Sequence, residues 1–271
     1  MYSGTTLRPL KYFDAWFGAH QKIDRVARQH LQTLLPRGRA FPTRRDIIRF
    51  EGYDGPDGIK RKTPGRDELW HFIDPHNEAD RQIVDVLQHN FDELVKALKE
   101  GAHTKAAFEA SWLAHGIVDG LTPAHQYPYE AELIRLRGGG NETRTSATKK
   151  LIMPGDSLPE RMSKNWQMWG DKGLITTHFA FEWGIAVMIM PFRIKRALPT
   201  PEELEAAAAA GLAETFLERA KEVADLRMYD QFYKSGWTLR LMQQARRELV
   251  PRIINLVTIA WYLAAREAYG A

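Results

Sequence analysis

The stretch W112-L-A-H-G-I-V-D-G-L-T-P-A-H125 places three ionisable residues in an otherwise apolar segment. His115 and Asp119 are four residues apart, so on a helix they lie on one face. Pro123 is expected to end such a helix and let His125 turn back toward the pair. Because an unpaired charge in an apolar environment is costly, these groups require a partner, a metal ion or a chemical task.

A second pair with the same spacing, His178 and Glu182, lies in the apolar segment 173–192. Two such pairs on two helices are how helical bundles assemble metal sites in their cores. A lone histidine on an apolar face is more often a hydrogen-bonded core residue, and a single pair is more often a plain helix contact. Two pairs together with His125 favour a metal site.

The composition narrows the chemistry of that site. The 271 residues include no cysteine, so imidazoles and carboxylates must hold any metal, a donor set that suits zinc. The net charge of +4 indicates a mild preference for anionic partners, too small to argue for nucleic-acid binding alone. We expect no signal peptide and a cytoplasmic location, with export by an unrecognised route left open. Segment 173–192 has the length of a membrane span, but its two ionisable residues favour a buried helix, so we expect no transmembrane segment.

The apolar spacing throughout the chain is helical, with no strand-like alternation and no internal repeat. It predicts helices over residues 12–35, 77–99, 104–120, 160–190, 200–226 and 238–269, the last with a possible kink at Pro251. Residues 36–70 are predicted to be mostly loop with one short helix near 44–50, and residues 135–150 a mobile, glycine-rich basic loop. The expected fold is therefore all-α, a single domain over residues 1–271, built as a multi-helix bundle with a metal cluster in its core.

The order His, three residues, Asp, five residues, His, with Pro two before the last His, resembles the core motif of zinc-dependent phospholipase C and the single-strand-specific zinc nucleases. The later pair in H178-F-A-F-E182 is similar to a second ligand pair of that family. G52-Y-D-G-P-D57 and W70-H-F-I-D-P75 look like its middle segments, and G18-A-H-Q-K-I-D looks like its first helix. The resemblance covers positions from about 18 to 182 in the family's order.

This resemblance implies a cluster of two or three zinc ions. It assigns one ion to Asp57, His71, His115 and Asp119, and a second ion to His125, His178 and Glu182 with Asp119 bridging. A third ion would use His20 with the amine and carbonyl of a chain that in the family begins with Trp. Because this chain begins with Met-Tyr, the number of ions stays open. Asp54 and Asp67 are alternatives to Asp57.

The resemblance implies hydrolysis of a phosphodiester or phosphomonoester, with Asp57 and Asp119 as the catalytic carboxylates. The substrate could be a phospholipid or a nucleic acid, and the oligomeric state is not predicted. The alternative is a catalytically degenerate metal-binding helical protein that acts as a scaffold or binding module. A third hypothesis is a helical protein with a satisfied polar core and no metal. A metalloprotease is disfavoured because the chain has no His-Glu-x-x-His motif.

Overall fold

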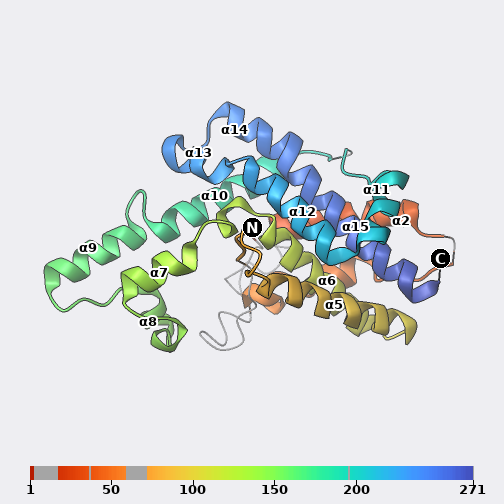
Figure 1. Ribbon diagram of the computed structural model, residues 1–271, viewed down its shortest axis with the longest axis horizontal. Helices are drawn as coiled ribbons and strands as arrows, with labels where there is room; N and C mark the ends of the chain where they lie inside the picture. Colours follow the sequence, from red (N-terminus) through yellow and green to blue (C-terminus); the bar gives the residue numbers. More distant parts are fainter. Residues whose placement is uncertain (3–17, 37, 59–71, 195, 271) are drawn as a thin grey trace.

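The structure, a computed structural model, describes residues 1–2, 18–36, 38–58, 72–194 and 196–270 (Figure 1). In these ranges it contains helices and no strand, which confirms the all-α prediction. The helices of the first half are α2 (Ala19–Leu34), α3 (Arg44–Ile48), η2 (Gly52–Asp54), α5 (Gln82–Lys99), α6 (His103–Gly120), η3 (Pro123–His125), α7 (Tyr129–Arg137) and η4 (Asn141–Thr143). Those of the second half are α8 (Ala147–Leu151), α9 (Leu158–Trp169), α10 (Leu174–Ile189), α11 (Pro201–Ala210), α12 (Leu212–Asp225), α13 (Met228–Ser235), α14 (Leu239–Gln244), the π-helical turn η5 (Ala245–Leu249) and α15 (Val250–Tyr269).

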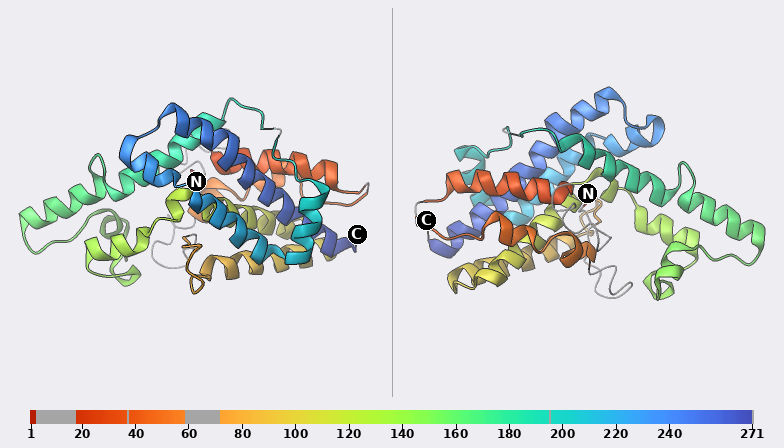
Figure 2. Two further views of the ribbon diagram at one scale, coloured as in Figure 1. Left: turned by 45° about the horizontal axis from the view of Figure 1, so that its top comes forward. Right: turned by 180° about the vertical axis from the view of Figure 1, so that it is seen from behind.

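Helix α6 lies in the middle of the main body, against α5, α15, α3 and α2 (Figures 1 and 2). Trp261 of α15 is fully buried, and its indole N–H donates to the carbonyl of Ala110 on α6 at 2.9 Å. Gly120 lets two neighbours approach closely, because a Cβ there would lie 2.6 Å from Phe216 Cζ and 2.9 Å from Ile83 Cδ1. The helix that carries His115 and Asp119 is therefore fixed by close packing.

Helices α7, α8 and α9 project from the main body as an arm (Figure 1). The arm has a small core of its own, formed by Leu133, Leu136, Met153 and Met168. Helix α10 connects the two parts. Its first residues, Leu174 and Ile175, pack against the small core, whereas Phe181, Ile185 and Ala186 belong to the main core.

Several predicted boundaries were wrong. Residues 135–150 are not one loop, because α7 continues to Arg137, α8 begins at Ala147, and buried Arg144 forms a bidentate ion pair with Glu130 at 2.6 and 3.1 Å. The predicted helix over 160–190 is divided between α9 and α10. The irregularity in the last helix is the π turn at Ala245–Leu249, and Pro251 lies in the first turn of α15, where its missing N–H is tolerated.

The helical stretch Leu239–Tyr269 is long and apolar enough to cross a membrane by length and composition, with a mean hydropathy of 1.3 in its most apolar window. In this fold 78% of that window is buried. Helix α15 packs against α2, α5 and α6, and a core helix meets the same criterion of length and hydropathy.

Candidate metal centre

The centre is built around Asp119 at the end of α6. One turn earlier, His115 places its Nε2 atom 3.2 Å from Asp119 Oδ2, and both side chains are buried. After Gly120 the chain turns, with the Thr122 hydroxyl donating to the carbonyl of Val118 at 2.7 Å. The following turn η3 brings His125 back, with its Nδ1 atom 3.9 Å from Asp119 Oδ2. This is the arrangement that the opening stretch of sequence predicts.

Helix α10 supplies the second pair. His178 Nε2 lies 3.1 Å from Glu182 Oε1, and His125 Nε2 lies 2.7 Å from the same oxygen. One ligand atom from each of these three residues falls within 4.8 Å of the others. They form a group that can hold a metal ion, assembled from η3 and α10.

The backbone of Met1 lies in the same place. Its amine forms an ion pair with Asp119 and lies 3.2 Å from Glu182 Oε1. Its carbonyl oxygen is 2.6 Å from His20 Nε2, which is also 3.1 Å from Asp119 Oδ1. The next residue, Tyr2, is held by the N–H of Ala19, which donates to the Tyr2 carbonyl at 2.7 Å at the start of α2. The structure thus brings together the third group that the family resemblance implies, with Met in place of Trp.

Asp57 lies at the open side of the centre. It sits in a helical turn over residues 56–58, with its Oδ1 atom 4.0 Å from His115 Nε2 and its side chain 32% exposed. Asp54, the alternative from the same loop, is exposed to solvent and is not among the described residues that line the cavity over the centre. His71 and Asp67 lie outside the described residues.

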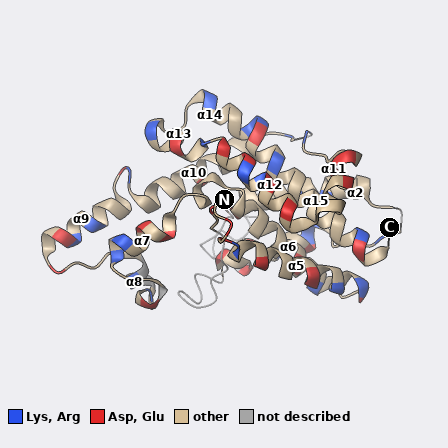
Figure 3. Ribbon diagram, viewed as in Figure 1, with Lys and Arg blue, Asp and Glu red and all other residues tan. Residues whose placement is uncertain are grey.

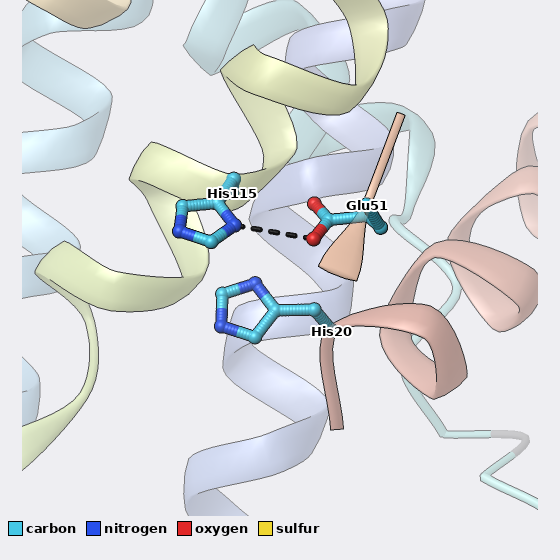
Figure 4. A group of neighbouring side chains, drawn as sticks. All are labelled: His20, Glu51 and His115. Carbon is cyan, nitrogen blue, oxygen red and sulfur yellow. Dashed lines mark hydrogen bonds and ion pairs between the residues drawn. The ribbon is translucent and has the colours of Figure 1, made fainter. Parts of the chain in front are cut away.

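Glu51 is a member of the centre that the sequence analysis missed. Its Oε2 atom lies 3.2 Å from His115 Nδ1, the ring nitrogen opposite Asp119 (Figure 4). The imidazole rings of His20 and His115 stack with centroids 4.2 Å apart, and each offers a ligand atom within 4.8 Å of Glu51. Glu51 precedes a glycine-rich loop, and nothing in its local sequence marks it.

Asp24 is the second missed residue, and a signal for it exists. It follows His20 by four residues on α2, the same spacing as the two pairs on α6 and α10. Asp24 is buried, and neither of its carboxylate oxygens has a hydrogen-bond partner among the residues that the structure describes. Burial and the neighbouring charge of Glu51 raise the pKa of Asp24 well above its usual range.

The two carboxylates that face Met1 are ionised. Burial acts to raise the pKa of Asp119, but the Met1 amine and the surrounding imidazoles outweigh it and hold that pKa well below its usual range. Burial likewise opposes ionisation of Glu182, and the Met1 amine and His178 lower its pKa well below the usual value. The centre therefore holds two ionised carboxylates in the interior, stabilised by the Met1 amine and the surrounding imidazoles.

His115 and His125, both buried beside Asp119, have pKa values shifted in opposite directions. Burial lowers the pKa of His115, but Glu51 and Asp119 on either side raise it well above the usual value. Burial dominates at His125 and lowers its pKa to about 4, so this ring is neutral near pH 7 and has a lone pair available.

A cavity of about 260 Å³ opens over the centre. Its floor contains Asp57, Asp119 and His125, and its apolar wall includes Leu133, Met168 and Ile175. The remaining described lining residues are Met1, Phe72, Tyr129, Glu130, Arg144, Leu151, His178 and Glu182. Phe72 and Tyr129 stack nearly parallel at 5.3 Å. The cavity thus joins a polar, acidic floor to an apolar wall.

The donor set can hold a metal ion. His115 Nε2 is buried and approaches Asp119 without forming a hydrogen bond, so it points into the space that Asp57 and Asp119 flank. Imidazole nitrogens and carboxylate oxygens are ligands of zinc and of other divalent first-row metals, and a bound cation stabilises buried carboxylates. Comparison with protein-family models, with curated proteins and with solved structures gives no match for this chain.

Proposed function

We propose that this chain is a zinc-dependent phosphoesterase that hydrolyses a phosphodiester in the cavity over Asp119. The observation that carries the proposal is the position of the Asp119 carboxylate. Three separate groups of donors face it: His115 with Asp57, His20 with the Met1 backbone, and His125 with His178 and Glu182. A single carboxylate shared by several ion sites is the arrangement that a multinuclear hydrolase requires.

The residues that would hold the ions follow from these groups. Asp57, His115 and Asp119 would hold one ion, His125, His178 and Glu182 a second, and His20 with the Met1 amine and carbonyl a third. Zinc held there would supply Lewis-acid polarisation of the phosphoester and would lower the pKa of a bound water to about 7.

The chain's own residues would bind and orient the substrate. Asp57 is the partly exposed carboxylate of the floor, so it is placed to accept the proton of an attacking water. The guanidinium of Arg144, fixed by Glu130, lies in the wall and offers a positive charge to a phosphate. The apolar wall favours a substrate with an apolar part next to its phosphate.

Glu51 would orient His115. A neutral imidazole that ligates through Nε2 keeps its proton on Nδ1, and Glu51 lies 3.2 Å from that atom. The carboxylate would therefore accept the Nδ1–H bond, fix the tautomer and hold the ring plane toward Asp57 and Asp119. Glu51 is in this sense a positioning residue rather than a ligand.

The first test is the zinc content per chain, measured by elemental mass spectrometry on protein purified without chelator. We expect two or three equivalents. The same preparation is then assayed with bis(4-nitrophenyl) phosphate, a chromogenic phosphodiester. Asp57→Asn should lower the hydrolysis rate by about 10²- to 10⁴-fold, the contribution of a general base. Asp54→Asn, in the same loop but exposed, should keep the wild-type rate.

The outcomes separate the hypotheses. Bound zinc with hydrolysis that depends on Asp57 supports the proposal. Bound zinc without hydrolysis of phosphodiester, nucleotide or phospholipid substrates favours the scaffold alternative. Protein that neither contains zinc nor rebinds it overturns both.

A further inference from the structure

Helix α9 exposes a continuous apolar stripe. Its members are Leu158, Met162, Trp166 and Trp169, with exposed fractions of 61%, 66%, 69% and 43%. At 100° per residue these four positions fall within an arc of about 80° on one side of the helix. Single exposed apolar side chains are common on protein surfaces, but a stripe that includes two tryptophans requires an explanation.

The packing of the arm does not provide that explanation. The inward side of α9 is a different one, where Met168 is buried in the small core. Asn165 fixes the helix in this orientation, because its side-chain amide accepts from the N–H of Met153 and donates to the carbonyl of Met153, both at 3.0 Å. The stripe therefore faces outward, and the hydrogen bonds of Asn165 fix the rotation of α9 about its own axis.

The stripe continues to the mouth of the cavity. The indole N–H of Trp169 donates to the carbonyl of Leu151 at 2.7 Å, at the end of α8. Leu151 lines the cavity, and both it and Ile152 are about half exposed. One apolar surface thus extends from the outer side of α9 to the opening over the metal centre.

The same region has a small positive charge. Residues 129–172, from the start of α7 to the turn after α9, contain eight Lys and Arg against six Asp and Glu, a net charge of +2. Lys and Arg as well as Asp and Glu lie along the segment from α7 to α9 in Figure 3. On α9 itself, Arg161 is exposed and lies about 60° from the edge of the stripe, whereas Lys164 lies on the far side of the helix and forms an ion pair with Glu160 at 2.8 Å.

We propose that the stripe of α9, with Leu151 and Ile152, docks on the surface of an anionic phospholipid membrane. An exposed apolar stripe with tryptophans and a basic residue near its edge has the character of a helix that lies in the membrane interface. The positive charge of the region complements anionic headgroups. Docking in this way places the mouth of the cavity against the headgroup layer.

The docking step does not depend on the metal centre. What rests on the proposed function is the consequence, that the phosphodiester cleaved in the cavity is one of a phospholipid headgroup. Membrane docking and phosphodiester hydrolysis are therefore tested by different measurements.

The test is sedimentation of the full chain with vesicles made of equal parts of phosphatidylcholine and phosphatidylserine, compared with vesicles of phosphatidylcholine alone. We expect binding to the mixed vesicles, a blue shift of tryptophan fluorescence, and weaker binding at high salt. The double variant Met162→Glu, Trp166→Glu should lower the partition coefficient by roughly tenfold or more, since it removes apolar contact and adds negative charge. Leu239→Glu, at an exposed leucine 78% accessible on α14, is the matched control and should bind as the wild type does.

Failure of the wild type to bind the mixed vesicles would overturn the proposal, as would wild-type binding by the double variant. A dimer in light scattering that the double variant abolishes, without any vesicle binding, would assign the stripe to a second copy of the chain and also overturn it. The vesicle experiment is repeated after zinc removal with a chelator. Vesicle binding that persists without zinc shows that docking does not need the metal, and vesicle binding by zinc-loaded wild type that hydrolyses no phosphodiester leaves the docking surface standing and refutes only the phosphoesterase.

Discussion

Replacing Asp119 with asparagine tests the centre most directly, because the change removes the shared charge and keeps the shape. In the metal-free protein the buried Met1 amine loses an ion-pair partner and keeps Glu182 at 3.2 Å. Removing one partner of a buried ion pair costs about 3–5 kcal/mol. In a chain of this size each kcal/mol corresponds to about 2–4 °C of melting temperature, so the chelated variant should melt roughly 6–20 °C lower.

The same variant should lose more than one ion. Asp119 faces all three proposed donor groups, and of these the group of His125, His178 and Glu182 has its ligand atoms within 4.8 Å of one another without it. His20, Glu51 and His115 have the same closeness, but there Glu51 is proposed to position His115 rather than to bind an ion. We expect the zinc content of Asp119→Asn to fall to one equivalent or less, measured by elemental mass spectrometry after dialysis against a fixed free-zinc concentration. Calorimetry with and without chelator gives the stability.

The control is Glu109→Gln, which removes another buried carboxylate from α6. Glu109 lines a separate cavity with His89 and Trp112, so its zinc content should equal that of the wild type. An Asp119→Asn variant that keeps the wild-type number of zinc ions and the wild-type melting temperature would refute the reasoning that Asp119 is shared.

Three further predictions concern neighbouring features of the centre. Glu51→Gln should weaken zinc binding by about 10- to 100-fold in competition with a chromogenic chelator, since it replaces the charged acceptor of the His115 Nδ1–H group with a neutral, weaker one; an unchanged affinity would show that the Glu51 charge does not support the ring as a ligand. Burial opposes the protonated forms of His115 and the Met1 amine, but neighbouring carboxylates raise both pKa values, so both groups hold protons near neutral pH that zinc must displace. Zinc affinity should therefore rise from about pH 6 to 8 with proton release, measured by calorimetry in buffers of different ionisation enthalpy, and a pH-independent affinity would contradict this. Gly120→Ala should lower the free energy of unfolding by about 1–3 kcal/mol, because its Cβ would lie 2.6 Å from Phe216 Cζ; an unchanged urea midpoint would mean that Phe216 moves aside freely.

The sequence predicts the helices well where their apolar faces are long, as in α5 and α6. The sequence misplaces helix boundaries that depend on hydrogen bonds of individual side chains. Helix α5 begins at Gln82 rather than near residue 77, because Asp80 accepts from the N–H of Asp74 at 2.9 Å and stabilises a turn before the helix. Helix α6, predicted to begin at residue 104, begins at His103, and its N-cap is Ala102.

For the centre, spacing predicts the pairs that lie on single helices. His115 with Asp119 and His178 with Glu182 are close because α-helical geometry makes them so. Glu51 comes from a loop with no periodicity, so only the fold brings it to His115. The contact between Met1 and Asp119 joins residues 118 positions apart, and no local pattern encodes it.

Helix α10 belongs to two cores, and the group on it lies at their junction. Leu174 packs in the arm and Phe181 in the main body, with His178 and Glu182 in the same helix close to the boundary. An ion bound by these two residues and by His125 of the main body would link the arm to the main body, which would otherwise be separate cooperative units. Without it, the arm can open as a local unit of lower stability, and amide hydrogen exchange in α7 and α9 would then be faster than in α6. Zinc would thus stabilise the attachment of the arm to the main body, in addition to its role in phosphoester hydrolysis.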